Sequence, residues 1–253
     1  MSSSTGGADF YNKVAQKFGG YITHEIHTTE YSTGNPEEIF KSKLLEYGNS
    51  DSIVLDIGCA DGRSTLSVAP DFKKIIAIDF SEGMLNSAKR NQLKRGVLNV
   101  SFEKQDASSM SYPDSFFDLI YSRRGPTYYE EFFRLLKKSG IYAEIQIGEN
   151  DAKSIKKVFG RGQDFGLWNI SRLQRNKEEI EKAGFKVIFA QDYEYSEYYA
   201  SPKDLESFLE GVPIFEDFDP ERDKKYLEEY IKGNTSNKGV FLQRHRVVIV
   251  AQK

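Results

Sequence analysis

The sequence has little cysteine, no long apolar run and almost no net charge, and each shortage excludes a class of protein. Cys59 is the single cysteine among 253 residues, which excludes an internal disulfide and a cysteine-rich zinc site. No apolar run approaches the roughly 20 residues of a membrane-spanning helix. With 35 basic and 38 acidic side chains the net charge is −3, a poor match to a nucleic-acid backbone. Residues 1–9 lack the basic-then-apolar order of a secretory signal, so we expect a soluble cytoplasmic protein.

The chain contains many aromatic residues and a regular alternation of apolar runs with helical segments. Seven runs have the length and composition of buried strands, and amphipathic or capped segments lie between most of them. Alternation of this kind is typical of a mostly parallel sheet with helices on both faces. The expected strands are 52–57, 74–79, 100–104, 116–121, 141–147, 185–190 and 240–251.

The remaining segments suggest a tail and two caps around this sheet. Residues 1–9 are small and polar and are expected to be disordered, and 10–48 carry helical periodicity that predicts an N-terminal cap. Residues 49–253 form the main domain, with cap insertions at about 150–176 and 196–238. Helices are expected over 63–68, from Ser81 to about Lys94, and from Gly125 to Lys138.

A glycine-containing turn joins the first strand of the sheet to the first helix. It reads Asp56-Ile57-Gly58-Cys59-Ala60-Asp61-Gly62, and Asp79 ends the next strand 21 residues after Gly58. Glycines let a backbone approach a ligand, and an acid at that place can accept two hydrogen bonds from a ribose diol. The dinucleotide pattern would need glycine at 58, 60 and 63, and Arg63 would crowd a pyrophosphate. A nicotinamide dehydrogenase is therefore disfavoured.

The turn resembles motif I of the class I S-adenosylmethionine-dependent methyltransferases, which reads acid-x-Gly-x-Gly-x-Gly. In this sequence Ala60 replaces the middle glycine of the motif. The segment 75–85 resembles the second strand of that family and its sequel, and 116–120 resembles its fourth strand. Residues 135–140, Leu-Leu-Lys-Lys-Ser-Gly, resemble the family's Leu-Lys-Pro-Gly-Gly turn, without its proline. The resemblance covers about residues 50–150. It implies a Rossmann-like α/β fold with a seven-stranded, mostly parallel sheet.

The resemblance also implies a cofactor, S-adenosylmethionine, which leaves as S-adenosylhomocysteine. Asp56 would orient the turn or meet the amino group of the cofactor through water, and Asp79 would hold the ribose hydroxyls. The methionine portion would pack against the turn residues Gly58, Cys59, Ala60 and Gly62.

Five further positions are implied at the adenine and at the reactive methyl group. Phe80 and Met84 would lie on either side of the adenine, although both residue types are often plain core residues. Asp106 would accept from the adenine amino group, and the N–H of Ala107 would donate to a ring nitrogen. Ser122, after the fourth strand, would lie near the sulfonium methyl group.

The acceptor of the methyl group has no sequence motif of its own. In-line displacement of a neutral leaving group needs alignment and exclusion of water, and a base only if the acceptor must lose a proton. His24 and His27 are candidate bases. A metal site is not indicated, because no third metal ligand is evident near them. Arg123 and Arg124 could hold an anionic acceptor or pair with acids of the cap. The candidate catalytic residues are therefore His24, His27, Ser122 and Arg123.

Aromatic residues are concentrated around the expected cap, where they could line an acceptor pocket or only pack against the sheet. They are Tyr11, Tyr21, Tyr128, Tyr129, Trp168, Tyr193, Tyr195, Tyr198 and Tyr199. The leading hypothesis is methyl transfer to oxygen or nitrogen of a small molecule, with no membrane partner. RNA or tRNA methylation would need a basic patch, against which the acidic residues 202–232 argue. A non-catalytic protein that binds S-adenosylmethionine is the other alternative, and the oligomeric state stays open.

Overall fold

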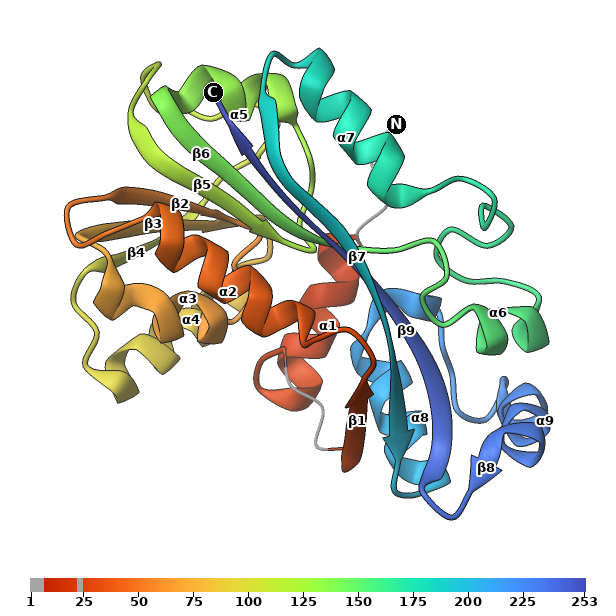
Figure 1. The fold of residues 1–253 in the computed structure, drawn as a ribbon. Helices are drawn as coiled ribbons and strands as arrows, with labels where there is room; N and C mark the ends of the chain where they lie inside the picture. Colours follow the sequence, from red (N-terminus) through yellow and green to blue (C-terminus); the bar gives the residue numbers. More distant parts are fainter. Residues whose placement is uncertain (1–6, 22–24) are drawn as a thin grey trace.

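A twisted nine-stranded sheet forms the centre of the computed structural model, which describes residues 7–21 and 25–253 (Figure 1). The strand order is β1-β7-β9-β6-β5-β2-β3-β4, and β8 pairs with β9 off this path. The pairs β2/β3, β2/β5, β3/β4 and β5/β6 are parallel, whereas β9 is antiparallel to β6 and β7. The strands are β1 (His27–Tyr31), β2 (Ile53–Ile57), β3 (Lys74–Asp79), β4 (Val100–Lys104), β5 (Phe117–Arg123), β6 (Leu136–Ile147), β7 (Lys186–Tyr199), β8 (Thr235–Ser236) and β9 (Gly239–Gln252).

All seven predicted strands are present, and the predicted fold class is confirmed. Strands β2 and β3 are apolar along their length because both faces of this part of the sheet are buried. The prediction missed β1 and β8. Strand β1 reads His-Thr-Thr-Glu-Tyr and is exposed at four of its five residues, so it has no apolar face that could signal a strand.

Helices cover both faces of the sheet. Side chains alternate along each strand, so Val54 packs into the core beneath α2, α3 and α4, and Leu55 into the core beneath α5 and α7. The helices are α1 (Ala8–Phe18), α2 (Pro36–Tyr47), α3 (Arg63–Val68), α4 (Glu82–Arg95), α5 (Tyr129–Leu135), α6 (Lys153–Phe159), α7 (Arg172–Lys182), α8 (Pro202–Gly211) and α9 (Lys224–Asn234), with short 3₁₀ turns at Ala69–Asp71 and Pro213–Phe215.

Two predicted helices had wrong boundaries. Helix α1 begins at Ala8, inside the segment 1–9 that was expected to be disordered. Helix α5 covers only Tyr129–Leu135 of the predicted 125–138. Its start is delayed because Gly125 lies against the end of β2, where a Cβ would come within 2.5 Å of the Ile57 oxygen. Its end is early because Leu136 is already extended and pairs with β5.

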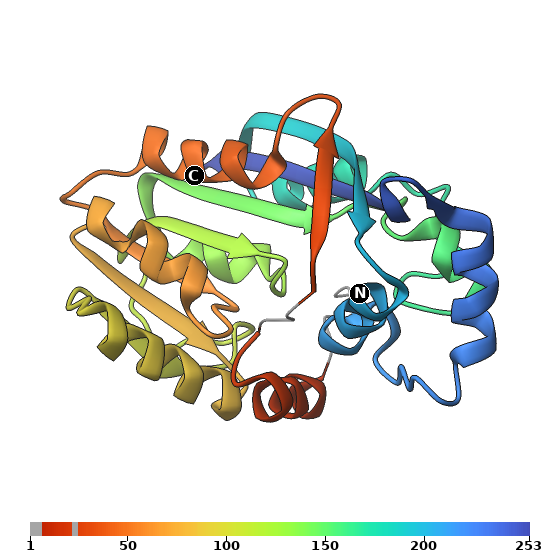
Figure 2. The same ribbon diagram turned by 90° about the horizontal axis from the view of Figure 1, so that it is seen from below.

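The outer halves of β7 and β9 continue past the carboxyl ends of the parallel strands and carry a second group of helices. We call α6, α8 and α9 with these strand halves the cap lobe (Figures 1 and 2). Its own apolar core includes Phe159, Tyr199, Leu205, Phe215, Leu227, Tyr230 and Leu242. Ligands of open α/β sheets bind outside the carboxyl ends of the strands, so the cap lobe stands over the expected binding edge. The division into tail, cap and main domain stays a prediction.

Helix α1 joins the sheet domain to the cap lobe. Asn12 accepts hydrogen bonds at its Oδ1 from the Ser81 hydroxyl, at 2.7 Å, and from the Gly83 N–H, at 3.1 Å, at the start of α4. At the other end Lys17 pairs with Glu210 of α8 at 2.5 Å. Residues 19–21, which follow α1, therefore lie over the carboxyl edge of the sheet. Within the part of the chain that the structure describes, no helix combines the length and apolar character needed to cross a bilayer.

Candidate active site

The turn between β2 and α3 has a backbone that only small residues tolerate. Gly58, Ala60 and Gly62 all have positive φ values, of 76°, 47° and 71°. A Cβ on Gly58 would lie 3.2 Å from the Gly125 Cα, and one on Gly62 would lie 2.6 Å from the Phe102 ring. The N–H groups of Gly58 and Cys59 both donate to the Ile78 carbonyl oxygen near the end of β3. The turn is therefore held open beside the carboxyl ends of two strands.

We expect Gly62→Ala to lower the free energy of unfolding by about 2–3 kcal/mol. About 1 kcal/mol would come from the left-handed backbone, and the rest from the clash with Phe102. Gly96→Ala is the matched control, because Gly96 has a similar φ of 65° and no atom of the described residues lies within 4 Å of its would-be Cβ. Urea denaturation of both variants measures the difference. Equal losses would contradict the proposed tight packing beneath the turn.

Asp79, at the end of β3, has an ordered and nearly buried carboxylate. Its Oδ2 accepts from the Ala60 N–H at 2.8 Å and its Oδ1 accepts from the Ser81 N–H at 2.8 Å. Burial raises the pKa of this carboxyl, and the backbone donors oppose that rise. Each oxygen uses one acceptor site on the backbone, so the carboxylate keeps capacity for two further donors such as ribose hydroxyls.

Asp56 lies under the same turn, in the middle of the sheet. Its Oδ2 accepts from the Thr65 hydroxyl at 2.6 Å and from the Tyr121 hydroxyl at 2.8 Å. Burial is the main cause that raises the pKa of Asp56 to about 6. The carboxylate therefore organises the start of α3 and faces the cavity described next.

Two connected cavities flank Asp79. The first, of about 620 Å³, runs over the glycine turn to α2, and the second, of about 600 Å³, runs to the loop after β4. They share Gly58, Asp79, Phe80 and Pro126, so together they form one elongated site. Among the residues predicted to bind cofactor, those that line it are Asp56, Gly58, Cys59, Ala60, Asp79, Phe80, Asp106 and Ala107.

Three residues predicted to bind the cofactor do not line these two cavities. Gly62 packs beneath the turn on Phe102, as described above. Met84 is fully buried in a small core with Val14 and Ala15 of α1. Ser122 is also fully buried, and its Oγ, beneath Gly125, has no hydrogen-bond partner among the described residues. Their assignment to cofactor contact stays a prediction, and the geometry favours supporting roles.

A third cavity, of about 260 Å³, separates the carboxyl edge of the sheet from the cap lobe. It shares five residues with the first cavity, so the two are continuous; these are Tyr11, Tyr21, Glu37, Arg123 and Arg124. Its other walls come from β1, β7, β9 and the cap lobe, including His27, Thr29, Tyr31, Asp151, Tyr195, Glu197, Phe208, Arg244 and Arg246. We call it the acceptor cavity.

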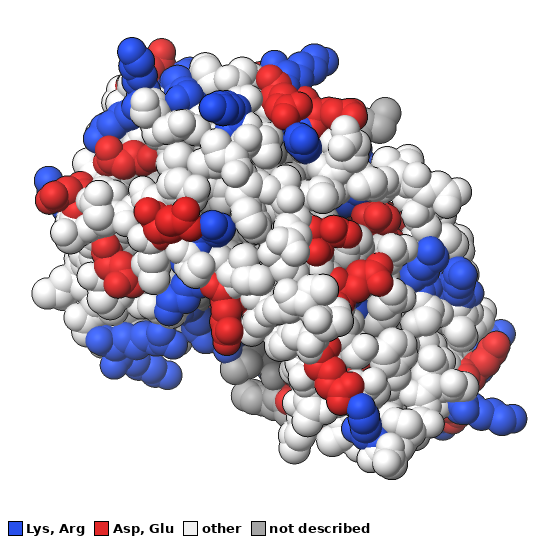
Figure 3. Space-filling model, in the orientation of Figure 1, with Lys and Arg blue, Asp and Glu red and all other residues white. Residues whose placement is uncertain are grey.

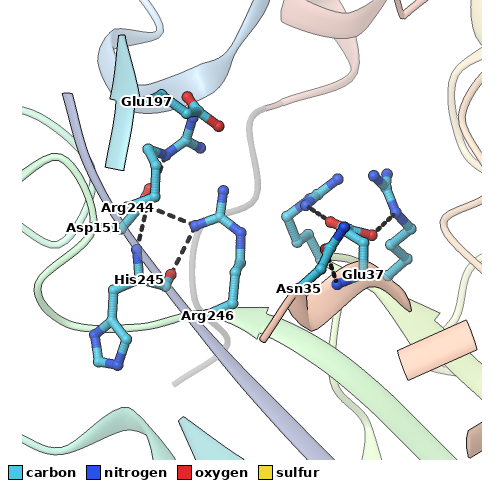
Figure 4. Close-up of polar contacts among 9 residues, drawn as sticks. Asn35, Glu37, Asp151, Glu197, Arg244, His245 and Arg246 are labelled. Carbon is cyan, nitrogen blue, oxygen red and sulfur yellow. Dashed lines mark hydrogen bonds and ion pairs between the residues drawn. The ribbon is translucent and has the colours of Figure 1, made fainter. Parts of the chain in front are cut away.

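Glu37, at the start of α2, binds the two arginines at the carboxyl end of β5, Arg123 and Arg124 (Figure 4). Its carboxylate accepts from Arg123 Nε at 2.8 Å and from Arg124 Nη1 at 2.5 Å. Burial would raise the pKa of Glu37, but the guanidiniums of Arg124 and Arg123 outweigh it and lower the pKa to about 2. The alternative that the two arginines pair with an acid of the cap is thus realised, and both still line the acceptor cavity.

The lowered pKa of Glu37 predicts a specific acid sensitivity. Its stabilising contribution is complete above the ordinary pKa of about 4.5 and is lost as the pH falls toward 2. We expect Glu37→Gln to be less stable than wild type at neutral pH, with a gap that closes as the pH falls through this window. Urea denaturation at several pH values measures it, with the exposed neighbour Glu38→Gln as the control. A gap independent of pH would contradict the ion pairs.

Sequence reasoning missed a second charged cluster, on β9. Asp151 Oδ1 accepts from Arg244 Nε at 3.0 Å, from Arg246 Nη1 at 2.6 Å and from the His245 N–H at 2.9 Å (Figure 4). Arg244 Nη1 also donates to Glu197 on β7 at 2.6 Å. The detectable signal was the spacing of the two arginines, because residues two apart on a strand share a face.

The two described histidines lie in different settings. His24 is outside the described residues. His27 lies at the start of β1, lines the acceptor cavity and packs beside the Tyr199 ring at 5.3 Å. His245 is buried, and its Nδ1 accepts from the Asn150 N–H at 3.2 Å. Of the two described histidines, His27 is the one that the structure places on a cavity wall.

Comparisons with known proteins agree with this site. Residues 54–140 match a family model described as a methyltransferase domain. Phosphoethanolamine N-methyltransferase 1 of Zea mays is 28% identical over 228 residues, which cover 85% of this chain and 44% of the relative. Sterol 24-C-methyltransferase of Pneumocystis carinii is 26% identical over 184 residues, covering 65% and 48%. The YcgJ protein of Bacillus subtilis has a similar fold, with a TM-score of 0.59 at 16% identity, covering 85% and 98%.

The strand order and the glycine turn define a Rossmann-like nucleotide-binding domain. Together with the methyltransferase-domain match over residues 54–140, they support the class I S-adenosylmethionine-dependent methyltransferase family. The domain match agrees with S-adenosylmethionine as the cofactor and disfavours the nicotinamide alternative. The chain spans less than half the length of the two curated relatives named above.

Proposed function

We propose that this protein transfers the methyl group of S-adenosylmethionine to nitrogen or oxygen of a small molecule. The observation that carries the proposal is the continuity of the elongated site with the acceptor cavity at Tyr11, Tyr21 and Arg123. A methyltransferase needs such a junction because donor and acceptor must meet in line.

The residues present fit the cofactor. Gly58, Cys59 and Ala60 of the glycine turn line the first cavity, and Asp79 offers carboxylate oxygens beside them. We assign the ribose hydroxyls to Asp79, the adenine to the cavity with Phe80 and Asp106, and the methionine portion to the turn beside Asp56. Bound there, the cofactor supplies an electrophilic methyl group on a neutral leaving group.

The chain contributes alignment and a dry junction to this reaction. Tyr11 and Tyr21 face each other edge to face at 5.7 Å in the wall shared by the two cavities, where they limit access of water. Burial raises the pKa of both phenols, so at neutral pH they are protonated and can donate hydrogen bonds to an acceptor. An ammonium acceptor must lose a proton before attack, and His27 is the described histidine on the cavity wall that could accept it.

The lining of the acceptor cavity discriminates between the acceptors named for the relatives. A sterol presents mainly apolar surface, whereas this cavity is lined by four arginines, three carboxylates and several tyrosines. A charged amine such as phosphoethanolamine matches that lining better. We therefore propose a small polar acceptor for this chain.

RNA or tRNA methylation is less well supported. Acidic and basic side chains are interspersed over most of the face shown in Figure 3, which includes the cap lobe. Backbone recognition of RNA would need a more continuous basic surface.

Formation of S-adenosylhomocysteine from S-adenosylmethionine tests the proposal. The purified protein is incubated with phosphoethanolamine, ethanolamine, glycine and catechol, and the product is measured by mass spectrometry. We expect acceptor-dependent product for at least one polar amine. Product with none of these acceptors, despite tight binding of S-adenosylmethionine, would favour the non-catalytic alternative.

A further inference from the structure

Arg244 and Arg246 are unusually well fixed for residues on a cavity wall. Both side chains are at least nine-tenths buried, and both line the acceptor cavity from the same face of β9. The Arg244 guanidinium lies 5.0 Å from the Phe208 ring centre, and that of Arg246 lies 5.9 Å from the Tyr195 ring centre. The aromatic contacts and the shared carboxylate of Asp151 hold the two guanidinium groups in place. Less side-chain entropy is therefore lost when they bind a ligand.

Charge in the acceptor cavity is not balanced among the described residues. Four guanidiniums line it, from Arg123 and Arg124 on one side and Arg244 and Arg246 on the other, against the carboxylates of Glu37, Asp151 and Glu197. Of the four, Arg246 also acts electrostatically on Glu37, across the cavity. One positive charge is therefore in excess along the lining of the cavity, and a bound anion would neutralise it.

The four arginines also converge on one point of the wall. All four lower the pKa of the Tyr21 phenol, against the larger effect of burial, which raises it. Tyr21 lines both the acceptor cavity and the first cavity. The excess charge is thus centred between the cofactor side and the cap lobe.

Arg246 has a buried donor without a partner. Its Nη1 donates to Asp151 and to the His245 oxygen, but its Nε makes no hydrogen bond within the described structure. The residue is only 2% exposed and its Nε is buried, so neither water nor a ligand reaches that atom without a shift of the guanidinium. An unsatisfied buried N–H on a charged group is costly, so a shift that gives Nε an anionic ligand oxygen as acceptor would be favourable. Figure 4 shows this guanidinium on the side of its cluster that faces Glu37.

We infer that Arg246, with Arg244 and the Arg123–Arg124 pair, forms an oxyanion subsite for the methyl acceptor. This inference rests on the proposed function and names its substrate class, a small molecule with a carboxylate or phosphate at one end and the nucleophile at the other. Arg244 and Arg246 line the acceptor cavity without reaching the first cavity, whereas Arg123 and Arg124 line both. The anion therefore lies on the cap-lobe side, and the nucleophile points toward the cofactor.

Binding of simple anions to the protein saturated with S-adenosylhomocysteine tests the inference without turnover. The probes are inorganic phosphate and acetate, titrated by calorimetry at constant ionic strength. We expect saturable binding of at least one probe at about millimolar concentration. Preference for phosphate would indicate a phosphate-bearing acceptor and preference for acetate a carboxylate. No saturable binding of either probe would overturn the inference.

Three variants locate the anion. Arg246→Ala should weaken probe binding about tenfold or more, and Arg246→Lys should weaken it less, because lysine keeps the charge but loses the fork. Arg175→Ala, on the partly exposed surface of α7, is the control and should bind as wild type. S-adenosylhomocysteine should bind all three with unchanged affinity, which verifies folding.

The outcomes separate this inference from the proposed function. Wild-type probe affinity in a folded Arg246→Ala protein would overturn the subsite and leave the methyltransferase proposal standing. If Arg246→Ala does not fold, unchanged probe affinity in Arg246→Lys would overturn the subsite in the same way. Failure of the wild-type protein to bind S-adenosylhomocysteine would instead count against the proposed function, and the probe titration without it still decides the subsite.

Discussion

Asp79→Ala is expected to weaken S-adenosylhomocysteine binding about 100-fold. Under the proposed assignment of the ribose to Asp79, the variant removes two charge-assisted hydrogen bonds to the cofactor, and a loss of about 3 kcal/mol corresponds to that factor. It also frees the Ala60 and Ser81 amides that Asp79 now fixes, which loosens the turn. Isothermal titration calorimetry measures the affinity directly.

The control for this variant is Glu82→Ala, three residues further along. Glu82 is an exposed acid whose partner is the surface residue Lys104. Its removal changes net charge as Asp79→Ala does but leaves the cavities intact, so the affinity should stay within about twofold of wild type. A comparable loss in both variants would mean that charge alone, and not the carboxylate at the end of β3, governs binding.

Asp151→Ala is expected to have the largest effect on stability, a loss of about 3–5 kcal/mol in the free energy of unfolding. Asp151 is 1% exposed and is the carboxylate that Arg244 and Arg246 share. Its removal leaves the buried Arg246 guanidinium without a carboxylate partner, whereas Arg244 keeps Glu197, and an unpaired buried charge is costly. The cluster also joins the loop after β6 to β9, so the cap lobe should loosen first.

Thermal and urea denaturation measure this loss, with Asp114→Ala as the control. Asp114 also pairs with an arginine, Arg134 at 2.6 Å, but its side chain is 74% exposed. An exposed pair contributes about 0–1 kcal/mol, so the control should lose little. Similar losses in the two variants would contradict the interpretation of the Asp151 cluster as a desolvated network.

Much of the fold could be predicted because its signals are local. Strand β2, the glycine turn and Asp79 lie within 27 residues, and their apolar runs and glycines report backbone geometry directly. Ser81 was predicted to cap α4, and its hydroxyl accepts from the Met84 N–H at 3.1 Å. These features need no knowledge of distant contacts.

The acceptor cavity could not be predicted because its residues meet only through long-range pairing. Asp151 and Arg244 are 93 positions apart and come together through the antiparallel register of β6, β7 and β9. Glu37 likewise reaches Arg123 across 86 positions. Strand β1 is held by β7 rather than by any apolar pattern of its own. A single sequence does not encode these registers in a local pattern.

Calorimetric titration of the wild-type protein with S-adenosylhomocysteine, repeated with NAD, tests the central claim most directly. The account predicts one saturable site for S-adenosylhomocysteine with a dissociation constant of about micromolar order and no comparable binding of NAD. Tighter binding of NAD, or no binding of S-adenosylhomocysteine, would contradict the assignment of the elongated site beside Asp79.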